Sequence, residues 1–315
     1  MTQSSSQIGL GLEETVRLLL HEPEEQALTH VARLREILMK TVERDLSIRK
    51  TDLPSGEAVS PYVAALCLVA EKRTLAFLRG NYAAICHRIE TICDRVVYVL
   101  DAGCGPLGAL SLPLATQFSS DRVRFIATDI HEESIWQIQD TLKKCGLYRH
   151  FERFIITDLT SYKHHGKPLD LITSETMGAG LLGEPQAAIT ANLAPQLERG
   201  GIWTPERIVI RAYLATDGGL ERYELGEVIN MTAANPTEKV SVDFTLPILE
   251  ENTHLFLGTR IIVYGNHIIN EGESSITVPL KVPNGAISSS GNKLYLEYKP
   301  GCSKNDIVVL TQHQS

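Results

Sequence analysis

Apolar residues follow three patterns along the 315-residue chain. Between residues 12 and 50, Leu, Val and Ile recur at helical spacing among Glu and Arg, which predicts two amphipathic helices broken at Pro23. From about residue 60 to residue 205, strand-like apolar runs alternate with helical stretches, as in a largely parallel sheet covered on both faces. Beyond residue 205 the apolar runs are short and separated by turn residues, which predicts an antiparallel barrel or sandwich.

These patterns predict three domains: an N-terminal helical cap over residues 1–55, a doubly wound, Rossmann-like α/β domain over 56–205 and a β-rich domain over 206–315. Residues 51–57 are expected to form a loop, and Ser60-Pro61 to begin a helix. The strands expected in the last domain are Ile208–Leu214, Val240–Leu246, Arg260–Tyr264, Ile276–Leu280, Lys293–Tyr298 and Asp306–Leu310. Other features expected there are a helix over 221–228, turns at Asp217–Gly219, Gly265–Asn266 and Asn284–Gly285, and a loop over 288–292.

The most informative segment is Val97–Gly108, an apolar strand pattern that runs into a turn containing Gly103, Gly105 and Gly108. A glycine backbone can approach a ligand where a side chain would collide. Asp101 stands two residues before the first glycine. A carboxylate there would repel a pyrophosphate, so the turn is expected to hold a cationic amino-acid ligand rather than a dinucleotide.

Two further acids are expected at the same edge of the sheet. Asp129 ends the second predicted strand, where an acid beside the switch point of a parallel sheet can accept both hydroxyls of a ribose. Asp158 ends the third strand and is followed by Leu159. Two interpretations of Asp158 stay open: it accepts the amino hydrogens of an adenine that lies against Leu159, or it caps a helix or turn.

The glycine turn, the early aspartate and the ribose acid together resemble the class I S-adenosylmethionine methyltransferases. The resemblance implies S-adenosylmethionine as cofactor, S-adenosylhomocysteine as its product, and a Rossmann-like sheet. It also implies cofactor contacts from Asp101, Gly103, Gly105, Asp129, Ile130, Asp158 and Leu159.

A fourth predicted strand, Leu169–Ser174, delivers Glu175 to this edge, and Glu184 follows nine residues later. The Ser-Glu-Thr-Met-Gly run at 174–178, together with Glu184, resembles the double-Glu loop of the protein arginine methyltransferases. In that family the loop grips the guanidinium of the substrate. Without the resemblance, Glu175 would be a strand-end cap and Glu184 an exposed loop residue.

A second match to that family lies upstream. Arg73 begins an Arg-Thr-Leu run similar to the family's helix motif, which implies that Arg73 binds the carboxylate of the cofactor's methionine part. A β-rich domain directly after the methyltransferase core also resembles the family's architecture. The resemblance covers roughly residues 60–310.

Two facing carboxylates suit a planar cation, because each can accept a fork of two N–H bonds. They draw charge to one side of the guanidine and leave the target nitrogen free to attack the methyl group, and one of them can take the departing proton. Positioning and charge stabilisation should supply most of the rate, and the two acids should titrate together. Glu175 and Glu184 are therefore the candidate catalytic residues.

The chain departs from the family pattern in four places. Thr176 replaces the usual aromatic residue, Pro185 stiffens the chain after the second Glu, and Ser274–Thr277 stands where a Thr-His-Trp element is expected. A lone His267 nearby is interpreted as structural. No dimerisation arm is evident in the β domain, so the N-terminal helices are the candidates for pairing two copies into a homodimer. These departures favour a small molecule with a guanidine or amine, such as arginine or a biosynthetic metabolite, over a protein tail.

The amino-acid composition limits the cellular compartment and the classes of binding partner that we expect. A net charge of −8 argues against nucleic acid as the main substrate, since phosphate binding relies on Lys and Arg. Six scattered cysteines without a C-x-x-C pair favour reduced thiols over disulfides or a zinc site, so no metal is expected. No signal peptide or apolar run of about 18 residues is found, which predicts a cytoplasmic protein without membrane attachment.

Three alternatives remain at this point. An O- or C-methyltransferase would use the Glu pair to bind another polar group or as a base. A catalytically silent module would keep the cofactor pocket for assembly. An NAD-dependent oxidoreductase is opposed by Asp101.

Overall fold

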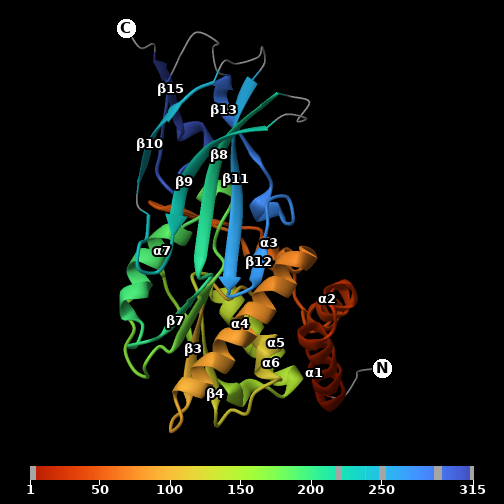
Figure 1. The fold of residues 1–315 in the computed structure, drawn as a ribbon. Helices are drawn as coiled ribbons and strands as arrows, with labels where there is room; N and C mark the ends of the chain where they lie inside the picture. The colour runs from red at the N-terminus through yellow and green to blue at the C-terminus, as the bar shows by residue number, and fades with distance from the viewer. Residues whose placement is uncertain (1–4, 217–221, 238, 248–252, 287–292, 313–315) are drawn as a thin grey trace.

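The computed structural model describes residues 5–216, 222–237, 239–247, 253–286 and 293–312. Figure 1 shows a parallel sheet in the lower half of the molecule and antiparallel sheets in the upper half. The turn expected at 217–219 and the loop expected at 288–292 lie outside the described residues.

The parallel sheet has the strand order β5-β4-β3-β6-β7. Its strands are β3 (Val97–Ala102), β4 (Val123–Asp129), β5 (Phe151–Ile156), β6 (Leu171–Ser174) and β7 (Ile202–Thr204). Chain order runs outward from β3 on one side and then returns to β6 on the other. The turn after β3 therefore lies at the topological switch point, where open parallel sheets bind ligands.

Side chains of alternate residues in β3 pack on opposite faces of this sheet. Val97 and Val99 pack with the helices α4, α5 and α6, whereas Leu100 and Ala102 pack on the other face with α7. The strand is buried at every position, as its unbroken apolar run indicates. These helices span Glu71–Thr91 (α4), Leu112–Ala115 (α5), Glu132–Cys145 (α6) and Gln186–Leu193 (α7).

The N-terminal helices α1 (Ser5–His21) and α2 (Glu24–Met39) pack against this helical layer. The predicted break at Pro23 is confirmed, because α1 ends before it and α2 begins after it. The helical pattern stops at Met39, earlier than the expected end near residue 50. Leu12, Val31 and Leu38 have no exposed surface, so the helix pair belongs to the same core as α4 and α6.

Residues 51–58 differ from the expected loop. They form an antiparallel hairpin of β1 (Thr51–Leu53) and β2 (Gly56–Ala58). The helix start at Ser60-Pro61 is confirmed: α3 (Pro61–Leu66) begins there, and the Ser60 hydroxyl accepts the Val63 N–H at 3.3 Å. The 3₁₀ turn η1 (Cys67–Val69) then leads into α4.

The C-terminal strands form two antiparallel sheets that share one core. The larger sheet contains β8 (Arg207–Thr216), β9 (Arg222–Met231), β11 (Thr253–Tyr264), β12 (His267–Ile269) and β13 (Leu280–Ala286). The smaller sheet contains β10 (Val240–Thr245), β14 (Lys293–Tyr298) and β15 (Val308–Gln312). Further 3₁₀ turns are η2 (Tyr148–His150), η3 (Ala179–Leu181), η4 (Ala194–Gln196), η5 (Ser275–Thr277) and η6 (Lys304–Asp306).

Three local predictions in this region are wrong. Residues 222–231 are a strand rather than a helix, because they pair with β8 along its length. Residues 275–277 form a 3₁₀ turn with a Ser274 capping box, and the strand begins only at Leu280. Asn284–Gly285 lies inside β13 instead of forming a turn.

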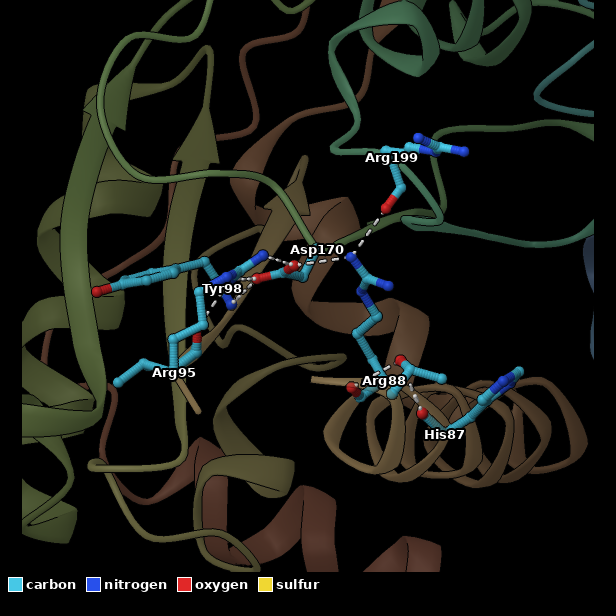
Figure 2. A network of polar contacts seen from close by, with 8 residues as sticks. His87, Arg88, Arg95, Tyr98, Asp170 and Arg199 are labelled. Atoms are coloured by element: carbon cyan, nitrogen blue, oxygen red, sulfur yellow. Dashed lines mark hydrogen bonds and ion pairs between the residues drawn. The ribbon is translucent and has the colours of Figure 1, made fainter. Parts of the chain in front are cut away.

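Polar contacts along α4 align it with β6. At its last turn, Arg88 donates to the buried Asp170 at 3.2 Å, and Arg95 donates to both Asp170 oxygens at 2.6 and 2.8 Å (Figure 2). In the middle of α4, Asn81 donates to the Thr173 hydroxyl at 3.0 Å. The first turn of α4 therefore lies over the carboxyl end of β6.

Candidate functional site

A cavity of about 780 Å³ opens at the carboxyl ends of β3, β4, β5 and β6. This size is typical of small-molecule and cofactor sites. The cavity brings together almost all of the candidate residues. Those that line it are Arg73, Gly103, Gly105, Asp129, Ile130, Asp158, Leu159, Glu175 and Glu184.

The glycine turn forms one wall. Gly103 and Gly105 have φ values of +87° and +61°, which residues with side chains rarely adopt. A Cβ on Gly103 would lie 2.6 Å from the Thr176 side chain, and a Cβ on Gly105 would lie 3.3 Å from the Ala64 side chain of α3, so both positions leave little room for a side chain. Gly108 serves packing instead: a Cβ there would lie 2.4 Å from Ile138 of α6.

Asp101 is the candidate that does not line the cavity. Its side chain is buried behind the turn and accepts a hydrogen bond from the Ser111 hydroxyl. Burial raises the pKa of Asp101 to about 7, although the Ser111 hydrogen bond lowers it. The structure thus places Asp101 where it supports the turn from behind, and its direct contact with the cofactor stays a prediction.

Asp129 is held in place by the backbone around it. Its Oδ2 accepts the Gly105 N–H at 3.0 Å and its Oδ1 accepts the His131 N–H at 2.8 Å. Each carboxylate oxygen has a second lone pair, and the side chain lines the cavity. Asp129 can therefore accept two hydroxyls while it ties the glycine turn to β4.

Both interpretations of Asp158 fit its geometry. Its Oδ1 caps the following turn, accepting the Thr160 N–H at 2.8 Å and the Thr160 hydroxyl at 2.7 Å. The side chain also lines the cavity beside the buried Leu159. A capping oxygen and an oxygen available to a base are thus compatible on one carboxylate.

Arg73 and Glu175 form an ion pair across the cavity wall. Arg73 Nη1 lies 3.4 Å from Glu175 Oε2, and Arg73 Nη2 donates to the Cys67 carbonyl at 2.7 Å. Both side chains are largely buried. Burial raises the pKa of Glu175, although Arg73 and the Met177 N–H lower it. Arg73 thus offers a cation to a carboxylate ligand while it faces one catalytic candidate.

Glu184 differs from Glu175 in its partners. Within the described residues its carboxyl group has no hydrogen bond or ion pair. Burial, and then the charge of Glu175, raises its pKa to about 8 against the partly opposing effect of Arg73. Arg73 pairs directly with Glu175 and acts on Glu184 only from farther away, so Glu184 is the stronger base of the pair.

Gln186 is a site residue that the sequence interpretation missed. It is fully buried, and its Oε1 accepts the Thr176 N–H and the Thr176 hydroxyl, each at 2.9 Å. These bonds fix the backbone directly after Glu175. Thr176 therefore replaces the expected aromatic residue with a hydrogen-bonded anchor.

The cavity is strongly acidic. Among the residues that the structure describes, seven carboxyl side chains line it, against the two cations Lys72 and Arg73. Both cations are already paired, Lys72 with a Glu273 oxygen at 2.8 Å and Arg73 with Glu175. The carboxyl side chains belong to Glu57, Glu71, Asp129, Asp158, Glu175, Glu184 and Glu273.

The Ser274–Ile276 run also lines the cavity, as expected of the segment that stands in place of the Thr-His-Trp element. His267, in β12, does not line it. Among the described residues no cluster of His, Cys, Asp and Glu side chains has an arrangement suited to a metal ion. No helix among them has the length and apolar character needed to cross a bilayer.

Comparison with known proteins identifies the domain that carries this site. Residues 99–201 match the family model described as a methyltransferase domain. A comparison with curated protein sequences finds no match.

Two solved structures share the fold. A chain of the Trypanosoma brucei PRMT1 enzyme–prozyme heterotetrameric complex with AdoHcy is 13% identical, with a TM-score of 0.51 over 75% of this chain and 87% of that one. Arabidopsis thaliana protein arginine methyltransferase 10, in an open conformation, is 13% identical, with a TM-score of 0.52 over 76% and 87%. The expected fold class is confirmed: a Rossmann-like parallel sheet with flanking helices and C-terminal antiparallel strands.

The chain is an S-adenosylmethionine-dependent methyltransferase. The cavity fits that cofactor, because a glycine turn, an acid with free lone pairs and an arginine all line it.

Proposed function

We propose that the protein methylates a nitrogen of a guanidine or amine carried by a small molecule. The observation that carries the proposal is the pair Glu175 and Glu184, two buried carboxyl groups to which the described part of the chain brings one cation, Arg73. A cationic acceptor supplies the charge that this part of the cavity lacks.

Arg73 and Asp129 hold the two ends of the donor in this scheme. Arg73 pairs with the carboxylate of its methionine part, and Asp129 accepts the ribose hydroxyls. The bound donor supplies an electrophilic methyl group on a sulfonium. Because that group needs no protein nucleophile, the chain's own residues act by binding and orienting the acceptor.

Glu175 and Glu184 hold the acceptor from the side opposite to its reacting nitrogen. Their charges draw the positive charge of a guanidinium toward the carboxylates, which leaves the reacting nitrogen electron-rich. As the new N–C bond forms, that nitrogen loses a proton. Glu184 receives it, because Arg73 already neutralises Glu175 and because a cationic acceptor beside Glu184 holds its carboxyl group, whose pKa burial raises to about 8, in the ionised form until the proton arrives.

Apolar side chains at the cavity wall favour an organic cation with a hydrocarbon part. Val63, Leu66 and Val69 line the cavity, yet are 45%, 45% and 52% exposed. Contact with methylene groups would remove this surface from water. An acceptor that pairs one cationic group with an aliphatic chain fits both features of the wall.

The proposal is tested by offering arginine, alkylguanidines and alkylamines with methyl-labelled donor and locating the label by mass spectrometry. We expect N-methylated product, and we expect Glu175→Gln and Glu184→Gln to cut turnover while leaving donor affinity near native. Glu71→Gln, which removes an exposed carboxylate from the rim of the same cavity, is the control. Product methylated on oxygen or carbon would contradict the proposal.

A homodimer is also proposed. The N-terminal helices bury their apolar faces on their own chain, so a second copy would use the surface they leave, including Leu10, which is 66% exposed. Light scattering tests this, with a monomer mass as the contradicting result.

The cytoplasmic location and a role in biosynthesis stay predictions.

A further inference from the structure

The two catalytic glutamates are held by different parts of the chain. Glu175 follows β6 directly and faces Arg73 of α4, so the parallel sheet and its helix fix its position. Glu184 lies at the far end of the loop that follows, just before α7, whose Gln186 bonds back to Thr176, while the other contacts of that loop lead to the β domain and to the β1–β2 hairpin. The gap between the two carboxyl groups therefore depends on a second set of contacts.

The loop before Glu184 is bonded to the β domain. Its hydrogen bonds join the Gly180 N–H to the Thr259 hydroxyl (2.9 Å), the Tyr298 hydroxyl to the Gly180 carbonyl (3.2 Å), the Gly301 N–H to the Leu181 carbonyl (2.7 Å) and the Gly183 N–H to the Cys302 carbonyl (2.9 Å). In all four bonds the partner on the loop is a backbone group. The position of the β domain therefore fixes the path of the loop backbone.

The β1–β2 hairpin holds the same loop from the other side. The Glu57 N–H donates to the Gly183 carbonyl at 2.6 Å. Gly56 has a φ of +130°, and a Cβ on it would lie 2.8 Å from the carbonyl carbon of Glu184 and 3.0 Å from its Cα. The hairpin backbone thus touches the backbone of Glu184 with no room for a side chain.

The two holding segments also touch each other. Gly301 has a φ of +87°, and a Cβ on it would lie 2.0 Å from the Ser55 carbonyl oxygen and 3.5 Å from that of Glu184. We call these segments, residues 51–58 and 299–302, the clasp. The clasp encloses the Glu184 backbone between a hairpin that precedes the parallel sheet and a turn of the β domain.

We propose that Gly56 and Gly301 are positioning residues that set the distance of Glu184 from Glu175. This inference rests on the proposed function, because it assigns those two glutamates a shared acceptor. Neither glycine lines the cavity: Gly56 acts through the backbone of Glu184, and Gly301 acts through Ser55 of the hairpin that touches Glu184. A displacement of about 1 Å at a reacting group can lower turnover about a hundredfold.

The chain offers matched controls for both positions. Gly166 has a φ of +134°, close to that of Gly56, and a Cβ on it would meet only Arg153, at 3.6 Å. Gly272 has a φ of +81°, close to that of Gly301, and a Cβ on it would meet nothing within 4 Å. Alanine at the four sites thus imposes similar backbone strain, but only Gly56→Ala presses directly on the Glu184 backbone, and only Gly301→Ala presses on Ser55 of the hairpin that holds it.

The test compares kcat, acceptor KM and donor affinity of the four alanine variants, with an alkylguanidine as acceptor. We expect Gly56→Ala and Gly301→Ala to lower kcat by about 10- to 100-fold with unchanged donor affinity, and Gly166→Ala and Gly272→Ala to stay within about twofold. Equal kcat in the clasp and control variants would overturn the inference, as would an equal loss of donor affinity in the clasp variants. If wild-type protein methylates no nitrogen compound, the proposed function fails first.

A second measurement needs neither acceptor nor turnover. In hydrogen exchange of the donor-bound protein, we expect the amides of Gly180 and Gly183 to exchange faster in the clasp variants and at the native rate in the controls. Thr259→Val, which removes an acceptor of this loop while keeping its shape, should act in the same direction if an alanine variant fails to fold. Native exchange in Thr259→Val and in the clasp variants would overturn the inference.

Discussion

Glu184→Gln should stabilise the folded protein while it abolishes most of its turnover. Burial raises the pKa of Glu184 in the folded chain to about 8, against the ordinary glutamate pKa of 4.5. Between these two pH values the folded state binds more protons than the unfolded state, so the contribution of Glu184 to stability falls as pH rises. Because a glutamine does not titrate, the free energy of unfolding of the variant does not contain this decrease with rising pH.

The magnitude follows from the shift. At about 1.4 kcal/mol per pKa unit, a rise from 4.5 to about 8 corresponds to about 5 kcal/mol. Solvent screening of a carboxylate that lines a cavity and the coupled titration of Glu175 both reduce this effect, so we expect about half of it to appear. The variant should be about 2 kcal/mol more stable than wild type above pH 8 and nearly equal to it at pH 5.

Urea unfolding at pH 5, 7 and 9 measures this difference. Asp94→Asn, which removes an exposed carboxylate outside the cavity, serves as the control and should track wild type at every pH. If the free energies of unfolding of Glu184→Gln and wild type differ by the same amount from pH 5 to 9, the reasoning is refuted. That result would mean that burial does not raise the free energy of the ionised Glu184 carboxylate.

Three further substitutions test the rest of the site and its support. Asp129→Asn should weaken S-adenosylmethionine binding by about 2 kcal/mol in calorimetry, since charge-assisted bonds to two hydroxyls are lost; unchanged affinity would remove its ribose role. Arg73→Ala should weaken the same binding and lower stability by about 3 kcal/mol in urea, because Glu175 loses its cation; native donor affinity would show that Arg73 serves the ion pair alone. Asp170→Asn should lower stability by about 3 kcal/mol while donor affinity stays native, since its two arginines lie at the opposite end of the sheet; a stability loss below about 0.5 kcal/mol would mean that the network in Figure 2 is not a significant support.

The parts of the site that sequence could predict are those that local motifs specify. The glycine turn, Asp129 and Glu175 each stand at the end of an apolar strand, and the ends of parallel strands meet at one edge. That rule alone gathers residues far apart in the chain into one cavity. It also explains why Asp101, inside its strand rather than at the end, lies behind the turn.

The missed features arise from contacts between distant segments. The 51–58 hairpin has too few apolar residues to predict strands, and its pairing is supported by the bond from Glu57 to Gly183. Residues 222–231 carry a local pattern compatible with a helix, yet pairing with β8 makes them a strand. Gln186 looks like an ordinary first residue of a helix until its bonds to Thr176 are seen.

The boundaries proposed for the three domains also depend on such contacts. The N-terminal helices share a core with α4 and α6, so no separate cap is evident in the packing. Where one folding unit ends and the next begins stays a prediction. Limited proteolysis can test whether residues 1–55 detach from the remainder.

Transfer of a methyl group to nitrogen is tested most directly by labelling both partners of the new bond. Donor with a ¹³C methyl group and an alkylguanidine enriched in ¹⁵N are incubated with the wild-type protein, and the product is examined by NMR. The account predicts a one-bond coupling between ¹³C and ¹⁵N that is lost with Glu175→Gln. A labelled methyl group that is attached to oxygen or carbon, or that stays on a donor shown to be bound, would contradict it.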